Sequence, residues 1–258
     1  TGALIPADTH ATGVITARAD GVLAGQACAT ETWAQLDADV DVAWRCADGA
    51  ALTARTVVAD VAGPLRSVLT GERTALNFLC HLSGVATLTR RFADAAGDHT
   101  RVLDTRKTLP GLRALEKAAV RAGGGVNHRS SLSDLVLVKD NHRVGLTVGD
   151  AVTAAHALWP GRGVEIECDD ADQVRDAVSA GADLVLLDNL TPEQVAACVP
   201  LVRSGPRPDT PVEVSGGVTL DTVAAYAAAG ADLVSVGTLT QSAPALDLAL
   251  DLDPQGGR

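Results

Sequence analysis

Aromatic residues are scarce in this chain: Phe, Trp and Tyr together make up 2% of its 258 residues. A protein that holds single-stranded nucleic acid usually stacks the bases on aromatic rings, so this scarcity argues against such a platform. The formal net charge of −11 argues in the same direction, because a nucleic-acid partner favours a basic protein. We therefore expect no nucleic-acid partner. The hydrophobic content of 47% must then supply a largely aliphatic core.

Long apolar runs, a signal-peptide pattern and closely spaced cysteines are also missing. No stretch is apolar over the length that crosses a bilayer, so we expect no membrane partner and a cytoplasmic location. The five cysteines are odd in number and scattered, which favours reduced, structural thiols over a metal site or a redox pair. The chain also begins at Thr1 without an initiating Met, from which we expect that a leader segment precedes it.

The chain shows two kinds of pattern. In residues 13–26 and 51–63, short alternating runs are broken by Gly, Asp and Thr, which predicts an antiparallel sheet in a small α/β or α+β unit. Residues 63–92 repeat leucines at helical spacing instead. They predict a long helix that joins the two parts of the chain.

Six short apolar runs follow, with a helical segment between successive runs. Strands that alternate with helices predict a parallel sheet with right-handed crossovers, and six of them without a Rossmann glycine fingerprint favour a barrel. The near-repeat of AGADLVLLDN and AGADLVSVGT supports this, because one βα unit is used twice. The predicted strands lie at 102–105, 135–140, 164–169, 184–189, 212–217 and 233–237.

Polar residues end these predicted strands. Alternation places Glu165 and Glu167 on one face of their strand, pointing into the barrel, where two carboxylates are costly unless they meet cations or a ligand. Lys139, Asp188 and Ser215 end their own strands in the same way. Because active sites of such barrels lie at the C-terminal strand ends, we expect these side chains to meet there.

A basic stretch lies between Asp104 and His142 of this acidic protein. Cations that flank turn residues are poorly explained by stability alone, so the stretch predicts an anion pocket. Two glycine-containing strand ends, at 215–218 and 235–238, can offer backbone N–H groups to a phosphate, although these glycines could also serve only tight turns. The cations of the stretch are Arg106, Lys107, His128, Arg129 and Lys139.

Other charged residues have simpler interpretations. Arg113, Lys117 and Arg121 recur every four residues opposite an apolar stripe, which predicts a solvated helix face. Glu213, like the first glutamate of the strand at 164–169, is interpreted as an inward structural carboxylate paired to a nearby cation. For His142, stabilising the turn before it and contacting a ligand are equally open.

Several blocks of the sequence occur in an order and spacing that resemble the quinolinate phosphoribosyltransferase family. They are ERTALNFLCHLSGVATLT, DTRKTLPGLRALEKAAVRAGGGVNHR, VLVKDNH, LDN, SGGV and SVGTLTQSAPALD, and the resemblance runs from about Ile5 to Leu252. It implies an α/β fold, with an N-terminal α/β sandwich domain and an incomplete six-stranded α/β barrel, assembled as a homodimer. The implied limits are 1–82 for the first domain with its linking helix, 83–244 for the barrel, and 245–258 for a segment that packs back on the first domain.

The resemblance also implies the reaction of de novo NAD synthesis. Quinolinate and phosphoribosyl pyrophosphate would give nicotinate mononucleotide, pyrophosphate and carbon dioxide, with magnesium as the cofactor. For the two adjacent carboxylates of quinolinate, fixed cations are the suitable partners. By resemblance these are Arg106, Lys107, His128 and Arg129, with Arg73 reaching across from the neighbouring subunit.

The second substrate occupies the remaining candidate residues. Lys139 would meet the pyrophosphate. Glu167 and Asp188 would hold the ribose hydroxyls directly or through magnesium, and would stabilise the positive charge that develops on the sugar. Lys107, Lys139, Glu167 and Asp188 are therefore the expected catalytic residues. The two glycine ends would take the 5′-phosphate with Ser215, Gly216, Gly217, Ser235, Val236 and Gly237.

Three features depart from the family pattern. Gln241 stands where relatives usually carry His, SLSD at 131–134 replaces the commoner GLYD, and the leading helix that contributes to the dimer contact is not in this sequence. Two rival interpretations are a molybdenum-transport accessory protein of the same fold and a non-enzymatic ligand sensor. The intact turn at 139–142 argues against the first rival, and the carboxylates Glu167 and Asp188 beside the cations argue against the second.

Overall fold

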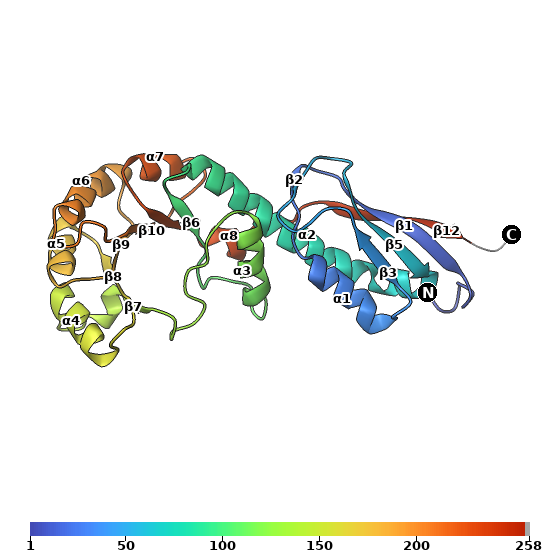
Figure 1. Ribbon diagram of the computed structural model, residues 1–258, viewed down its shortest axis with the longest axis horizontal. Helices are drawn as coiled ribbons and strands as arrows, with labels where there is room; N and C mark the ends of the chain where they lie inside the picture. The colour runs from blue at the N-terminus through green and yellow to red at the C-terminus, as the bar shows by residue number, and fades with distance from the viewer. Residues whose placement is uncertain (256–258) are drawn as a thin grey trace. The chain divides into compact units, whose positions relative to one another are not determined.

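Two compact units make up the protein in the computed structural model, which describes residues 1–255 (Figure 1). The domains expected from the sequence are mostly continuous in the chain, whereas each compact unit is built from several segments. The expected domain limits stay a prediction. Unit 1 consists of Thr1–Arg90, Ala114–Gly124 and the chain from Leu239 onward, and unit 2 consists of Arg91–Arg113 and Gly125–Thr238.

Unit 1 is built on a four-stranded antiparallel sheet with the strand order β12-β1-β5-β3. Burial alternates along its strands, as expected for a sheet with one face on the core, and the predicted antiparallel sheet is confirmed. A short ribbon of β2 and β4 completes the strands of this unit. The bounds are β1 His10–Ala17, β2 Gly21–Val22, β3 Asp41–Trp44, β4 Ala51–Leu52, β5 Val57–Pro64 and β12 Leu248–Gln255.

Two helices, α1 (Gln26–Leu36) and α2 (Leu65–Ala96), contribute to the aliphatic core of unit 1. Trp33 of α1 is fully buried and its indole N–H donates to the backbone oxygen of Val68 in α2 at 3.1 Å. Gly71 follows one turn later, and a Cβ there would lie 2.5 Å from the Trp33 ring. The contact between the two helices therefore needs a glycine. The helix expected over residues 63–92 is confirmed in α2.

Helix α3 (Arg113–Ala122) corrects one expectation. Lys117 is only 3% exposed and Glu116 is fully buried, so the helix face interpreted as solvated is partly packed. Glu116 accepts a hydrogen bond from His81 of α2 at 2.8 Å, within unit 1. By burial, Arg113 and Arg121 are exposed, and Lys117 is the member of the charged triplet that departs from the expectation. The spacing of four residues identified neighbours on a helix, but it could not identify what covers them.

Unit 2 is a six-stranded parallel sheet with the order β6-β11-β10-β9-β8-β7, and helices lie on its outer side (Figure 1). Among the described residues the end strands β6 and β7 do not pair with each other, so the predicted incomplete barrel is confirmed. Its strands are β6 Arg101–Leu103, β7 Val136–Val138, β8 Val164–Cys168, β9 Leu184–Asp188, β10 Val212–Ser215 and β11 Leu233–Ser235. The helices are α4 Val148–Leu158, α5 Ala171–Ser179, α6 Pro192–Arg203 and α7 Val223–Ala228, and α8 Thr238–Gln241 follows β11.

The near-repeat in the sequence has a structural counterpart in unit 2. Asp183 precedes β9, and its carboxylate accepts the backbone N–H of Val164 at the start of β8 at 2.9 Å. Asp232 precedes β11 and accepts the N–H of Val212 at the start of β10 at 2.7 Å. Each aspartate also pairs with an arginine. The repeated Asp therefore fixes the start of a neighbouring strand in both copies.

Two further findings concern the cysteines and the helices. Cys28, Cys46, Cys80, Cys168 and Cys198 are all free thiols. Within residues 1–255, none of the helices combines the length and apolar character that crossing a bilayer requires.

Candidate active site

A cavity of about 410 Å³ lies at the C-terminal ends of the parallel strands of unit 2. Four of its six strands, β7, β9, β10 and β11, contribute to the lining directly, and the cavity lies where the polar strand ends predicted it. Ten of the residues predicted as binding or catalytic lie on its wall: Arg106, Lys107, His128, Arg129, Lys139, Asp188, Ser215, Gly216, Gly217 and Ser235. The other lining residues are Asp104, Thr105, Leu137, Leu186, Asn189 and Glu213.

The two cation-bearing loops are joined by a buried aspartate. Asp104 follows β6 and is fully buried. One of its carboxylate oxygens accepts the backbone N–H of His128 at 2.9 Å, and the other accepts the side-chain amide of Asn127. Asp104 thereby fixes the start of the second loop against the first. From the sequence, this residue was identified only as the start of the basic stretch.

Arg113 makes a second link between these loops. Its guanidinium donates to the backbone oxygen of Arg106 at 3.2 Å and to that of Ser130 at 3.1 Å. It also donates to the Thr108 hydroxyl at 3.2 Å. Arg113 is therefore not merely a solvated helix residue, because its donors are directed at the loops that carry the cavity arginines.

Positive charge is concentrated at one side of the cavity. Burial lowers the pKa of Arg129, and the nearby Arg106 lowers it further, while Glu165 acts in the opposite direction. The guanidinium remains charged at physiological pH, so these effects measure the unfavourable electrostatic environment of the cation. An anion bound between the two arginines would relieve that cost.

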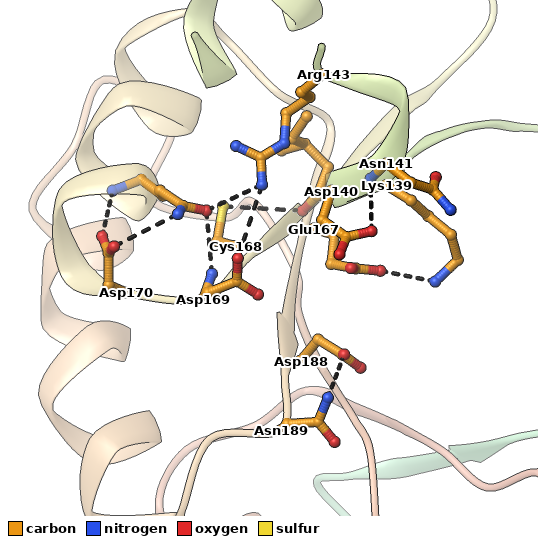
Figure 2. A network of polar contacts seen from close by, with 12 residues as sticks. Lys139, Asp140, Asn141, Arg143, Glu167, Cys168, Asp169, Asp170, Asp188 and Asn189 are labelled. Atoms are coloured by element: carbon orange, nitrogen blue, oxygen red, sulfur yellow. Dashed lines mark hydrogen bonds and ion pairs between the residues drawn. The ribbon is translucent and has the colours of Figure 1, made fainter.

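Lys139 is held by a carboxylate of the next strand. Its ammonium lies 2.7 Å from Glu167, whose side chain is 5% exposed, whereas that of Lys139 is 41% exposed (Figure 2). The backbone N–H of Lys139 donates to Nδ1 of His142 at 3.1 Å, so His142 stabilises the turn. Arg143 follows the turn and pairs with Asp169 beyond the end of β8 at 3.8 Å (Figure 2). The turn is thus fixed at both ends while the ammonium stays accessible.

Asp188 and Asn189 end β9, which pairs with β8 (Figure 2). Asn189 has a left-handed backbone, with φ of 57°, and its N–H donates to the oxygen of Ser215 on β10 at 2.9 Å. A Cβ on Gly216 would lie 2.2 Å from the Asn189 side-chain oxygen, and Gly216 itself has φ of 92°. Both facts require glycine at this strand end. The next glycine, Gly217, has φ of 62° with open space beside its Cα.

The second glycine end corrects part of the predicted phosphate site. Val236 is 2% exposed, and its N–H donates to the backbone oxygen of Leu103 at 2.9 Å, so it offers no donor to a ligand. Gly237 is not among the residues that line the cavity, but a Cβ there would lie 2.9 Å from the Lys107 side chain. The glycine therefore leaves room for the Lys107 side chain. Ser235 remains on the cavity wall.

Two buried glutamates contact His128. Its Nε2 lies 3.1 Å from Glu165 and 3.5 Å from Glu213, and these residues are 0% and 1% exposed. Burial alone would lower the pKa of His128, but the two carboxylates raise it to about 10. Burial and the neighbouring Glu213 raise the pKa of Glu165, against the effect of His128. The prediction that the strand carboxylates meet cations is confirmed, since Glu165 meets His128 and Glu167 meets Lys139.

Arg73 is not among the residues that line this cavity. It lies on α2 in unit 1, with a side chain that is 75% exposed and 3.8 Å from Glu72. Its predicted role across a subunit boundary therefore stays a prediction.

Comparison with known proteins identifies the family. Residues 1–83 match the family described as quinolinate phosphoribosyl transferase, N-terminal domain, and residues 85–251 match the C-terminal domain of the same description. The chain belongs to the quinolinate phosphoribosyl transferase family. This match over both domains confirms the resemblance found in the sequence.

Individual members of the quinolinate phosphoribosyl transferase family are similar over most of the chain. A protein of Mycobacterium leprae named nicotinate-nucleotide pyrophosphorylase (carboxylating) is 42% identical over 257 residues, which cover 98% of this chain and 90% of that protein. A human protein of the same name is 42% identical over 241 residues, covering 92% and 80%. Among solved structures, NadC from Streptococcus pyogenes has a TM-score of 0.92 at 38% identity, covering 98% of this chain and 90% of that one.

Proposed function

We propose that this chain transfers the phosphoribosyl group of phosphoribosyl pyrophosphate to quinolinate and releases pyrophosphate and carbon dioxide. The observation that carries the proposal is the cavity at the parallel strand ends of unit 2, where Arg106, Lys107, His128, Arg129 and Lys139 share one wall with carboxylates. The names of the relatives support the same activity.

The acid binds at the cationic side of the cavity. Quinolinate carries two adjacent carboxylates, and the planar forks of Arg106 and Arg129 suit them, with Lys107 as a further cation. The lowered pKa of Arg129, caused first by burial and then by Arg106, supports this placement, because a bound anion would offset both effects. Asp104 and Arg113 keep the loops in register, so the pocket exists before the acid enters.

Phosphoribosyl pyrophosphate binds along the other strand ends. Ser215, Gly216 and Gly217 offer a hydroxyl and a backbone turn open enough for the 5′-phosphate. Lys139 is half exposed on the same wall, so its ammonium can leave Glu167 and meet the pyrophosphate as it departs.

The carboxylates act on the sugar. When the bond between ribose and pyrophosphate breaks, positive charge develops on the ribose, and Glu167 and Asp188 stabilise it electrostatically. The ring nitrogen of the acid then carries the new bond and a positive charge, which stabilises the electron pair left on the ring carbon when the adjacent carboxylate departs as carbon dioxide. That carbon then takes up one proton, which gives nicotinate mononucleotide. During the loss of carbon dioxide the arginines orient the carboxylate and the buried wall limits access of water.

Magnesium is the proposed cofactor, and the residues present suit it. Glu167 and Asp188 supply hard oxygen donors at the ends of neighbouring strands, and magnesium is typically held by one or two carboxylates together with substrate phosphates. Bound there, the ion would neutralise charge on the leaving pyrophosphate.

A homodimer is proposed for two reasons. An apolar groove of about 650 Å³ lies beside β7, which is an edge strand of the parallel sheet. Large apolar residues around it are unusually exposed, including Leu132 at 72%, Leu158 at 70% and Trp159 at 56%. Apolar patches of this kind mark contact surfaces, and a second copy would also bring Arg73 to the acid pocket. The five free thiols are compatible with the proposed cytoplasmic location, a reducing compartment.

Substrate choice tests the proposed function. Purified protein with magnesium and phosphoribosyl pyrophosphate should release pyrophosphate with quinolinate and fail with nicotinate, which has one carboxylate fewer. Cations left without a carboxylate partner should reduce kcat/KM for nicotinate by at least about 1,000-fold. The measurement is coupled pyrophosphate release with each acid, and equal turnover of both acids would contradict the proposal.

A further inference from the structure

The buried glutamates behind His128 are not used by the reaction as derived above. Glu165 on β8 and Glu213 on β10 are 0% and 1% exposed, and both approach the same ring nitrogen, Nε2 of His128. One oxygen of Glu165 and both oxygens of Glu213 find no hydrogen-bond partner among the described residues. Buried carboxylates without partners are strongly unfavourable, so a positive charge is needed beside them.

We propose that Glu165 and Glu213 are positioning residues that hold His128 as a permanent, oriented cation in the wall of the acid pocket. The proposal rests on the proposed function for the identity of the acid, but the charge state of the ring does not depend on it. A charged ring would offset the charge of the two buried carboxylates, whereas a neutral ring would leave them beside each other without a cation at Nε2.

The two nitrogens of the ring act in opposite directions. Nδ1 lies 2.8 Å from the backbone N of Arg129, whose N–H can donate only to an unprotonated nitrogen. Charging the ring places a proton on Nδ1, so that hydrogen bond is lost and two donors, Nδ1–H and the N–H of Arg129, face each other. At Nε2, charging strengthens contacts to two buried carboxylates at 3.1 and 3.5 Å. The second effect wins, because charge-assisted bonds in a buried setting outweigh one neutral bond between adjacent residues.

A fixed imidazolium has a consequence for the pocket. A histidine with an ordinary pKa would lose its charge near neutral pH and leave the acid one cation short. With the pKa raised to about 10, His128 contributes a constant charge throughout the physiological range. The other charged groups around it are Asp104 from the end of β6 and the lining cations Arg106, Lys107, Arg129 and Lys139.

The first test reads the ring directly. In protein labelled with ¹⁵N at histidine, and assigned with His128→Gln, both ring nitrogens of His128 should keep imidazolium shifts from pH 6 to 9. Glu213→Gln should shift the titration of this ring into that pH range. Glu213→Asp keeps the negative charge, so it should move the titration at least partly back above that range. Asp172→Asn is the matched control, since it removes a charge from a side chain that is 93% exposed.

The second test measures the pocket by calorimetry with quinolinate. Wild type and Asp172→Asn should show similar affinity at pH 6.5 and 8.5. Glu213→Gln should bind almost as wild type at the lower pH and at least about 10-fold more weakly at the higher pH, because its ring becomes neutral. A merely structural role would weaken binding equally at both values and would overturn the inference.

The outcomes separate the two proposals. A neutral His128 ring in wild-type protein at pH 7 overturns the inference, even if Glu213→Gln does not fold. An unmoved ring titration in folded Glu213→Gln overturns it as well. No binding or turnover of quinolinate by the wild-type protein overturns the proposed function instead, and the charge of the ring then decides the role of the glutamates by itself.

Discussion

At the scale of the residue, the proposed function divides the charged side chains into two groups. One group faces charge that the substrate already carries, and the other faces charge that forms in the transition state. In the proposed function, Arg106 and Arg129 face charge that the acid already carries in the ground state. Glu167 and Asp188 would face charge that develops only as the bond to ribose breaks. Groups of the first kind contribute to binding, and groups of the second kind contribute to the rate.

This division predicts different kinetics for the two sets. Glu167→Gln or Asp188→Asn should lower kcat by about 2 kcal/mol or more of transition-state stabilisation, roughly 30-fold, and change quinolinate affinity little. Arg106→Ala or Arg129→Ala should weaken quinolinate binding itself. Calorimetric binding of quinolinate beside steady-state kinetics measures both quantities for the four variants. Loss of affinity in the carboxamide variants and loss of rate alone in the arginine variants would reverse the assignment.

Much of the site could be predicted from residues, because strand ends are marked by the change from apolar to polar side chains. What the sequence could not give is which partner each residue finds. Val236 was expected at the phosphate, but its N–H closes the pairing of β11 with β6, a strand about 130 positions earlier in the chain. Asp104 and Glu213 gained roles only when the sheet order placed them beside His128.

At the scale of the element, predictability followed the strength of the apolar pattern. The strands of unit 2 are short, buried and bounded by turn residues, and α2 repeats leucines over many turns. Helix α1 went unnoticed because only Ala29 and Trp33 are buried in it, too few positions to show a period. Strand β3, with four half-buried or exposed residues, carries as weak a signal.

The contact between α1 and α2 gives a stability prediction. Gly71→Ala adds a Cβ that would lie 2.5 Å from the buried ring of Trp33. The helix gains propensity from Ala, about 1 kcal/mol, but the ring is held by its bond to Val68 and cannot move aside cheaply. The clash should win, and the free energy of unfolding should fall by about 1–3 kcal/mol. Urea unfolding measures it, with Gly2→Ala as control because its Cβ meets nothing within 4 Å. Equal stability of the two variants would show that the helices can separate without cost.

At the scale of the whole molecule, charge and apolar surface are distributed unevenly. A protein with net charge −11 keeps several cations at one cavity, so the cavity stands out electrostatically against an acidic surface. The apolar groove beside β7 is the complementary feature, a surface poorly suited to water. A second copy that covers the groove and contributes a cation to the pocket would account for both features.

That arrangement predicts complementation between two inactive chains. Arg73→Ala and Arg129→Ala proteins should each be nearly inactive alone, since each lacks one cation of every acid pocket. If Arg73 acts across the subunit boundary, a mixed dimer holds one pocket with both arginines and one with neither. After equal mixing and complete exchange, half of the dimers are mixed, so about a quarter of wild-type activity should return. Pyrophosphate release measures the activity, and exchange is verified independently with differently tagged chains. Full exchange without recovery would place Arg73 in the pocket of its own subunit or outside any pocket.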